Sequence, residues 1–101
     1  MTSINHNLVP SDLDSFWMPF TASRNFKDAP RFIVSADGMY YKDSNGHEIL
    51  DGSAGLWCVN AGHRREHINQ AIAEQLEQLD FAHSFNSGHP HAFNYAHRLV
   101  K

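Results

Sequence analysis

The spacing of apolar positions changes along the chain, and each change marks a different kind of element. Residues 31–51 form short runs rich in strand-forming residues, separated by turns that contain glycine. In residues 64–79 the apolar positions recur at helical spacing instead. Helical spacing returns after Pro90, a residue suited to the first turn of a helix. The pattern predicts an α+β fold with a small sheet followed by two helices.

The predicted sheet is an antiparallel meander of three strands. Its first strand is 31–35, and the Asp37-Gly38 pair is a hairpin signal because glycine tolerates the positive φ of such turns. The return strand is 39–42, and after a turn at 43–46 the third strand is 47–51. A sheet this small is stable only when another element covers its apolar face.

A glycine-rich segment follows the predicted sheet. In residues 52–62, Gly52, Gly55 and Gly62 bracket Trp57. Glycines allow irregular backbone, and irregular segments that hold a large side chain often form sites. We therefore expect a site-forming loop.

The two predicted helices differ in how they end. The apolar stripe of the first helix, in 64–79, consists of Ile68, Ala71, Ile72, Leu76 and Leu79. The second begins at Pro90 and shows neither a Gly nor an Asn cap before Lys101, so we expect it to be still helical there. We interpret this pattern as a truncation within an element.

The N-terminal region combines a helix-start signal with a cluster of aromatic residues. Ser11 followed by Asp14 predicts a short helix, which Pro19 ends because it disfavours helical geometry at the residue before it. Large apolar side chains then crowd together at Phe16, Trp17, Met18 and Phe20. Such a cluster requires burial, in this chain or against another.

Composition and charge narrow the classes of function. The 101 residues carry a net charge of −3, which gives no electrostatic basis for binding nucleic acid or a membrane surface. The single cysteine, Cys58, excludes an internal disulfide and fits a reducing compartment. The first ten residues lack a secretory signal, and no apolar run approaches the roughly 20 residues of a membrane span. We expect a soluble cytoplasmic protein.

The eight histidines suggest a metal site, but their spacing does not support one. His63 and His67 are four residues apart, and His89 and His91 are two apart. Zinc requires three or four converging ligands, and the chain offers neither a cysteine pair nor a Glu after His63. We predict no metal site and interpret these histidines as surface and helix-cap residues.

Other candidate groups have two readings on the residues alone. Cys58 is either a thiol nucleophile or, as is more common, a buried structural cysteine. The Gly52–Gly55 stretch lacks the Gly-Lys-Ser/Thr ending of a phosphate loop and reads as an ordinary tight turn. Trp57, Phe20 and Phe85 fit core or interface packing as well as ligand contact.

Four segments together resemble one family of enzymes. They are Trp17–Ala22, Gly38–Tyr41, Leu50–His63 and Ser84–Pro90. These motifs are similar to those of class III aminotransferases of the omega-amino acid:pyruvate (β-alanine:pyruvate) branch. The long glycine-tryptophan segment is specific, whereas the hairpin alone is weak. The motifs are spread along most of the chain after Ser15, from Trp17 to Pro90.

The resemblance implies an enzyme larger than this chain. Its members are fold-type I proteins that use pyridoxal phosphate and form homodimers or homotetramers with active sites at the subunit interface. A lysine binds the cofactor as a Schiff base, and an amino group passes from an ω-amino acid or amine to pyruvate. In this frame, 1–30 is an N-terminal arm, 31–51 the meander, 52–63 an active-site loop and 64–101 a helix-loop-helix before the large α/β domain.

The resemblance also assigns residues to the site. Trp57 and Leu56 match the loop that walls the substrate pocket, Phe20 an aromatic laid over it, and Phe85 an aromatic that reaches the neighbouring subunit's site. No residue matches the family's cofactor-binding or catalytic positions, and none of the lysines (Lys27, Lys42 and Lys101) matches the Schiff-base lysine. We expect the isolated chain to be inactive. The alternative is a non-catalytic chain that only binds a partner.

Overall fold

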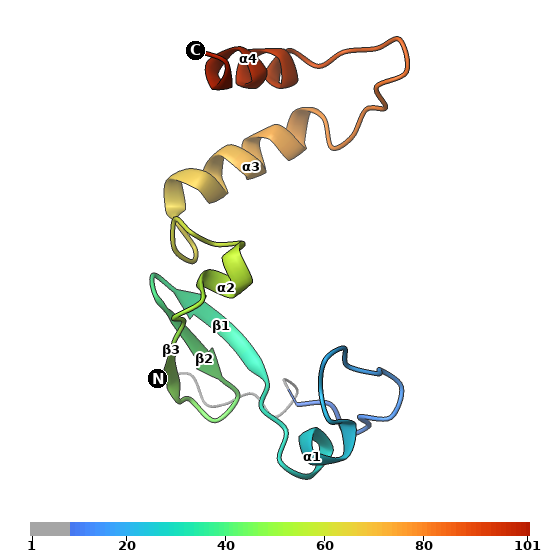
Figure 1. Cartoon of the computed structure of the whole chain (residues 1–101), viewed down its shortest axis with the longest axis vertical. Coiled ribbons are helices and arrows are strands. Elements are labelled where there is room, and N and C mark those ends of the chain that lie inside the picture. Colours follow the sequence, from blue (N-terminus) through green and yellow to red (C-terminus); the bar gives the residue numbers. More distant parts are fainter. Residues whose placement is uncertain (1–8) are drawn as a thin grey trace. The chain divides into compact units, whose positions relative to one another are not determined.

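The structure, a computed structural model, describes residues 9–101 in two compact units (Figure 1). One unit spans Met1–Arg65 and the other Glu66–Lys101. The first unit contains the sheet and the glycine-rich loop, and the second contains two helices. Each unit is described by itself below.

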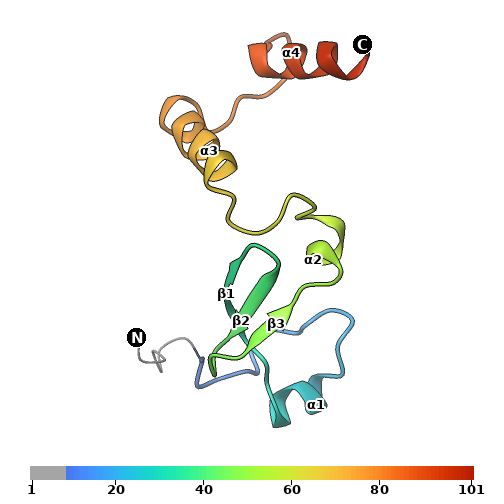
Figure 2. The same ribbon diagram turned by 90° about the vertical axis from the view of Figure 1, so that its left-hand side faces the viewer.

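The sheet of the first unit is the predicted three-stranded antiparallel meander. Strands β1 (Ile33–Asp37), β2 (Tyr40–Asp43) and β3 (Glu48–Leu50) lie side by side in chain order (Figure 2). In the β1–β2 pairing, the register shifts between Ile33 and Ser35, which marks a bulge. The α+β class is confirmed, with strand bounds that differ from the prediction by one or two residues.

The two faces of the sheet differ in exposure. Along each strand, exposed and less exposed side chains alternate, because successive residues point to opposite faces. Ala36, Tyr41 and Ile49 pair across the three strands on the less exposed face. The Tyr41 ring stands 4.5 Å, centroid to centroid, from the ring of His63. The end of the glycine-rich loop therefore supplies part of the cover that so small a sheet requires.

The helix predicted after Ser11 is wrong. The Asp12 carboxylate accepts the backbone N–H of Asp14 at 2.8 Å and the hydroxyl of Ser15 at 3.2 Å, which closes a local turn instead. The helix of this region lies further along, at α1 (Ser23–Asp28), and was not predicted.

The second unit contains helices α3 (Glu66–Gln78) and α4 (Pro90–Leu99). Pro90 lies at the start of α4 as predicted, and the His89 ring accepts the N–H of His91, which makes His89 a helix cap. The prediction that α4 is still helical at Lys101 is wrong, because Val100 already leaves helical geometry with φ −89° and ψ 0°.

Apolar side chains remain accessible throughout the described residues. In residues 9–101, no hydrophobic side chain is buried, and the two buried residues are Asp43 and Ser44. Phe16, Trp17 and Phe20 of the N-terminal cluster are all exposed, so this chain does not bury the cluster. No helix in this part of the chain has the length and apolar character needed to cross a bilayer.

Candidate functional site

The glycine-rich loop, residues 51–63, is fastened to the β1–β2 hairpin at both ends. At its start, the Asp51 N–H donates to the Met39 carbonyl at 2.8 Å. At its end, Gly38 and His63 form an isolated antiparallel bridge, with N–H to carbonyl distances of 3.1 and 2.8 Å. Backbone hydrogen bonds therefore bring the two ends of loop 51–63 together beside the turn of one hairpin.

The side chains of Asp51 and His63 close the same loop from within. Asp51 Oδ2 lies 2.6 Å from His63 Nε2 and accepts the Gly55 N–H at 2.8 Å. Oδ1 of the same carboxylate accepts the N–H and the hydroxyl of Ser53, both at 3.3 Å. The side chains are 4% exposed at Asp51 and 11% exposed at His63, so the pair is screened from solvent. One carboxylate thus joins the start, the middle and the end of the loop.

These contacts change the acidity of the groups involved. The hydrogen bond from His63 lowers the pKa of Asp51 from 3.8 to about 2, aided by the Gly55 and Ser53 amides and the Tyr41 hydroxyl and opposed by burial. Burial and the Asp51 charge raise the pKa of Tyr41. Asp51 is therefore a carboxylate, an acceptor only, across the physiological range.

The middle of the loop is a left-handed turn, α2 (Ala54–Trp57). Its residues take positive φ in succession, at 52° for Ala54, 58° for Gly55, 59° for Leu56 and 72° for Trp57. The Trp57 N–H donates back to the Ser53 carbonyl at 3.0 Å, and the N–H groups of Cys58 and Val59, just after the turn, donate to the Ala54 carbonyl at 2.9 Å. A left-handed conformation costs a residue other than glycine roughly 1–2 kcal/mol, so contacts from outside the turn must hold it. The irregular backbone expected here is in fact one hydrogen-bonded turn.

The turn presents large apolar side chains to solvent. Leu56 is 76% exposed and Trp57 is 84% exposed, which excludes the reading of Trp57 as core of this chain. Cys58 follows on the same exposed segment, and its Sγ lies 3.5 Å from the Leu56 carbonyl. The expectation of a buried structural cysteine is therefore wrong. The nearby His63 is engaged by Asp51 rather than by the thiol.

A small cavity of about 190 Å³ lies where the loop meets the hairpin. Its lining includes Gly38, Asp51 and His63. At its rim the Arg65 guanidinium packs over Gly62, whose φ is +98°, and Nε donates to the Ala61 carbonyl at 2.6 Å. The guanidinium can lie this close only because residue 62 is a glycine, since a Cβ there would lie 2.5 Å from a guanidinium nitrogen. The Arg65 side chain therefore covers the loop at Ala61 and Gly62, just before its end at His63.

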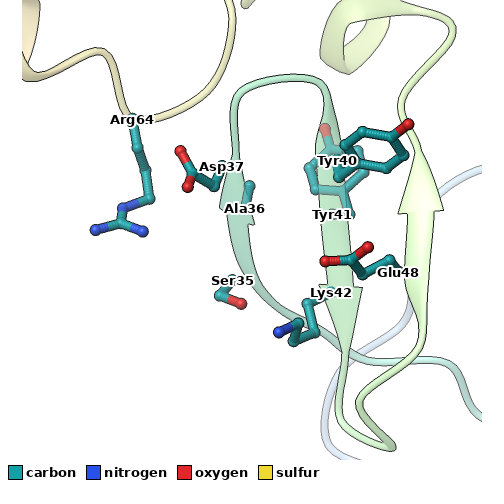
Figure 3. A pocket seen from close by; sticks show the side chains of 8 residues that line it. All are labelled: Ser35, Ala36, Asp37, Tyr40, Tyr41, Lys42, Glu48 and Arg64. Atoms are coloured by element: carbon teal, nitrogen blue, oxygen red, sulfur yellow. The ribbon is translucent and has the colours of Figure 1, made fainter.

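A second hollow, of about 330 Å³, lies mainly on the more exposed face of the sheet (Figure 3). Lys42 on β2 pairs with Glu48 on β3, and Ser35 of β1 pairs with Lys42 on its other side. Asp37 and Arg64 line the same hollow. The lining is mainly polar and of mixed charge, so it does not have the apolar character of the predicted substrate pocket.

Two of the four predicted substrate-binding residues lie on the same turn of the first unit. Leu56 and Trp57 are neighbours in α2. Phe20 lies in the N-terminal arm beside Pro19, in an exposed turn with φ 51°. Phe85 is also exposed and lies in the second unit, in the segment between α3 and α4, with its ring 5.9 Å from that of His83. Asp51 and His63, which hold the loop, were not singled out as a pair from the sequence.

The histidines do not gather into a metal-binding group in the described structure. Within residues 9–101 no three His, Cys, Asp or Glu side chains lie together as they would around a metal ion. His63 contacts Asp51, and in the second unit His91 Nε2 lies 3.1 Å from Gln75 Oε1.

Comparison with known families decides where the chain belongs. The profile of the family Aminotransferase class-III matches residues 21–101. The chain belongs to the class-III aminotransferases. The matched range includes the loop 51–63, the sheet and both helices of the second unit.

Two aminotransferases of known name are similar in sequence to this class-III aminotransferase chain. It is 53% identical over 91 residues to an omega-aminotransferase of Caulobacter vibrioides, and 45% identical over 88 residues to an omega-amino acid–pyruvate aminotransferase of Pseudomonas putida. These alignments cover 90% and 87% of the chain but only 21% and 20% of the relatives. The chain thus spans about a fifth of the length of the curated relatives it matches.

A solved structure supports the same assignment. An amine transaminase from an uncultivated Pseudomonas species, in a PLP-bound internal aldimine form, matches with a TM-score of 0.79 and 36% identity. The match covers 90% of this class-III aminotransferase chain and 21% of that structure. The described fold therefore also occurs within a solved transaminase chain.

Gly55→Ala is expected to destabilise the folded protein more than Gly38→Ala does. Both glycines have φ +58°, so both substitutions carry a conformational cost of roughly 1–2 kcal/mol. A Cβ at Gly55 would also come 2.9 Å from Val59 Cγ2 and 3.2 Å from the Tyr41 hydroxyl, whereas nothing lies within 4 Å at Gly38. Crowding of this kind adds about 1–3 kcal/mol. Urea unfolding of the two variants in the full-length protein measures the difference, and equal losses would contradict the tight packing at Gly55.

Acid is expected to remove the stabilisation that Asp51 provides. Its pKa of about 2 in the folded protein lies below the ordinary 3.8, so the carboxylate stabilises the fold above pH 3.8. This contribution decreases as the pH falls through 3.8 toward about 2. In urea unfolding of the full-length protein between roughly pH 5 and pH 2, the difference in unfolding free energy between the wild type and Asp51→Asn should therefore close. A gap that stays constant or widens in acid would contradict the described environment of Asp51.

Proposed function

We propose that this chain is the N-terminal portion of an omega-amino acid:pyruvate aminotransferase, which transfers an amino group from an ω-amino acid or amine to pyruvate. The observation that carries the proposal is the similarity to an omega-aminotransferase, at 53% identity, and to an omega-amino acid–pyruvate aminotransferase, at 45% identity, each over most of the chain. Because the chain spans about a fifth of those relatives, the activity belongs to the longer protein and not to this segment alone.

Within that protein, we assign the chain the role of a substrate-pocket wall. Loop 51–63 supports this role because it holds Leu56 and Trp57 exposed on a turn that costs free energy to form. An apolar wall of this kind favours amino donors with a hydrophobic part. Phe20 and Phe85 are assigned to the same pocket by resemblance, and their exposure leaves both rings free to meet other parts of the longer protein.

Pyridoxal phosphate is the cofactor proposed for the full-length protein, and the groups of this chain do not fit it. The cofactor would supply an electron sink for the amino transfer, and a lysine of the full-length protein would hold it as a Schiff base. Lys27 pairs with Asp14, the exposed Lys42 lies opposite Glu48, and Lys101 follows α4. We place the Schiff-base lysine and the cofactor site outside this chain and assign no chemical step to its residues.

Assembly and location follow the same proposal. The apolar stripe of α3 and the ring of Phe93 on α4 are exposed, and the full-length protein would cover such surfaces with its remaining parts or a second subunit. We propose a homodimer or homotetramer in the cytoplasm. The same exposed surfaces favour a second candidate function, a chain that binds a partner without catalysis.

An assay of the full-length protein tests the proposed function. With pyridoxal phosphate, β-alanine and pyruvate supplied, we expect alanine to form, and its formation should require both the cofactor and the amino donor. β-Alanine and an arylalkyl amine should be tested as donors in parallel, each with and without pyruvate. If neither donor yields alanine from a folded, cofactor-loaded protein, the proposed function is wrong.

A further inference from the structure

We propose that the Asp51–His63 pair positions the left-handed turn α2 and thereby determines which amino donors the pocket accepts, an inference that rests on the proposed function. The two side chains are positioning residues rather than catalytic ones. They are screened from solvent, whereas Leu56 and Trp57, the side chains they place, are exposed. Their influence on a donor therefore passes through the shape of the loop.

The first support is where the Asp51 carboxylate makes its contacts. Oδ2 accepts the N–H of Gly55, the second residue of α2, at 2.8 Å. The same oxygen lies 2.6 Å from His63 Nε2 at the far end of the loop. The turn is thus attached to both ends of loop 51–63 through a single oxygen atom.

The second support is that the turn needs an external constraint. Ala54, Leu56 and Trp57 all hold a φ between 52° and 72°, which side chains with a Cβ rarely adopt. The hydrogen bonds of the turn back to Ser53 and Ala54 are also available to a right-handed turn. They do not select the left hand, whereas the Gly55–Asp51 contact links the turn to a fixed point on the hairpin. Loss of that contact should let Trp57 move away from its place.

A second Asp–His pair in the same unit provides a matched control. Asp43 also accepts two backbone N–H groups, from Asn45 and His47, and its Oδ2 lies 3.1 Å from His47 Nδ1. This pair closes the β2–β3 turn, where the positive φ falls on Gly46 and causes no strain. Asp43→Asn therefore makes the same chemical change as Asp51→Asn without touching α2.

The experiment is a double-mutant cycle on the full-length, cofactor-loaded enzyme. The readout is the ratio of kcat/KM for an arylalkyl amine to kcat/KM for β-alanine, measured in the wild type, Asp51→Asn, Trp57→Ala and the double variant. Asp51→Asn removes the charged acceptor of the hydrogen bond from the turn, and we expect this change to shift the ratio about tenfold. The shift should have the same direction as the shift that Trp57→Ala causes. In the Trp57→Ala background, Asp51→Asn should leave the ratio unchanged, because the side chain it positions is gone. Asp43→Asn should not move it.

Variants of His63 keep the test independent of misfolding. His63→Gln retains an N–H donor near the Nε2 position and should keep the wild-type ratio, whereas His63→Leu should shift it as Asp51→Asn does. Thermal unfolding of each variant accompanies the kinetics. Rescue by Gln together with the non-additive cycle would support the positioning role.

Two kinds of result overturn the inference, and they are distinguishable. In the first kind, Trp57→Ala moves the donor ratio, but Asp51→Asn and His63→Leu either leave it unchanged or slow all donors equally while lowering the melting temperature. The proposed function then stands and the positioning role fails. If Trp57→Ala leaves the ratio unchanged, the pocket-wall assignment fails and the positioning role fails with it. An Asp51 effect that simply adds to that of Trp57→Ala also contradicts the inference.

Discussion

Replacing Trp57 with alanine in the full-length protein is expected to change its choice of amino donor. Removing the indole ring opens space in the proposed pocket, so bulky arylalkyl amines should be accepted better relative to β-alanine. Shape differences in apolar pockets are worth about 1–3 kcal/mol, so the ratio of kcat/KM between these donors should move by roughly ten- to two-hundredfold. Cofactor binding should persist, because no residue of this chain is assigned to the cofactor.

The same variant distinguishes the pocket wall from plain packing. If Trp57 instead packs against another part of the longer protein, Trp57→Ala should cost about 3–5 kcal/mol of stability and affect all donors alike. Trp17 is the chain's other tryptophan and is also exposed, so Trp17→Ala controls for the loss of an indole as such. An unchanged donor ratio with a large fall in melting temperature would contradict the pocket assignment.

The purified 101-residue chain is expected to show no transaminase activity and no Schiff-base absorbance with pyridoxal phosphate. Its three lysines are Lys27, Lys42 and Lys101, and none matches the family's Schiff-base position. The loss should therefore be complete, in contrast to the graded effects of substitutions. Borohydride reduction followed by peptide mapping checks this result, with the full-length protein as positive control. A cofactor adduct at one defined lysine, accompanied by turnover, would refute it.

The same preparation is expected to be poorly folded or to associate. No hydrophobic side chain of residues 9–101 is buried, and exposed apolar patches beyond a few hundred Å² promote association. Analytical ultracentrifugation and thermal unfolding test this expectation together. A clean monomer with a sharp cooperative transition would show that the sheet and loop are stable without further cover. Such a monomer would favour the second candidate, a self-sufficient chain that binds a partner.

Local signals were enough to predict the sheet and the start of α4. The Asp37-Gly38 pair and the turn ending at Gly46 position the two hairpins, and both glycines take positive φ, at 58° and 88°. Pro90 similarly marks the start of α4. These features depend on a few neighbouring residues, so the sequence pattern contains most of the information needed to place them.

Features decided by competing or distant contacts were not predicted. The Ser11 helix signal failed because the Asp12 side chain closes a turn on Asp14 and Ser15 instead. The left-handed conformation of α2 depends on the contact between Asp51 and Gly55, and Asp51 in turn contacts His63 at the other end of the loop. No spacing rule encodes such closure, because it requires the hairpin to be formed first.

The candidate site shows the same division. Trp57 and Leu56 were singled out from the sequence by resemblance, and the structure adds that they are exposed neighbours on one turn. The Asp51–His63 pair escaped notice because its members are separated along the chain and an Asp beside a glycine reads as an ordinary turn residue. The eight histidines are a signal in the sequence, but their spacing alone does not indicate that His63 pairs with Asp51.

The anchoring of loop 51–63 has a consequence for engineering. A segment whose ends meet on one hairpin is an Ω-loop, a compact unit of roughly 6–16 residues that can be exchanged as a whole. Asp51 and His63 sit at its borders, and Met39 and Gly38 contact it through backbone atoms alone, so a donor loop needs to keep those two border residues together with Gly55 and Gly62. Libraries that preserve these four positions and vary the rest of the loop would transplant new pocket shapes between relatives without redesigning the sheet beneath.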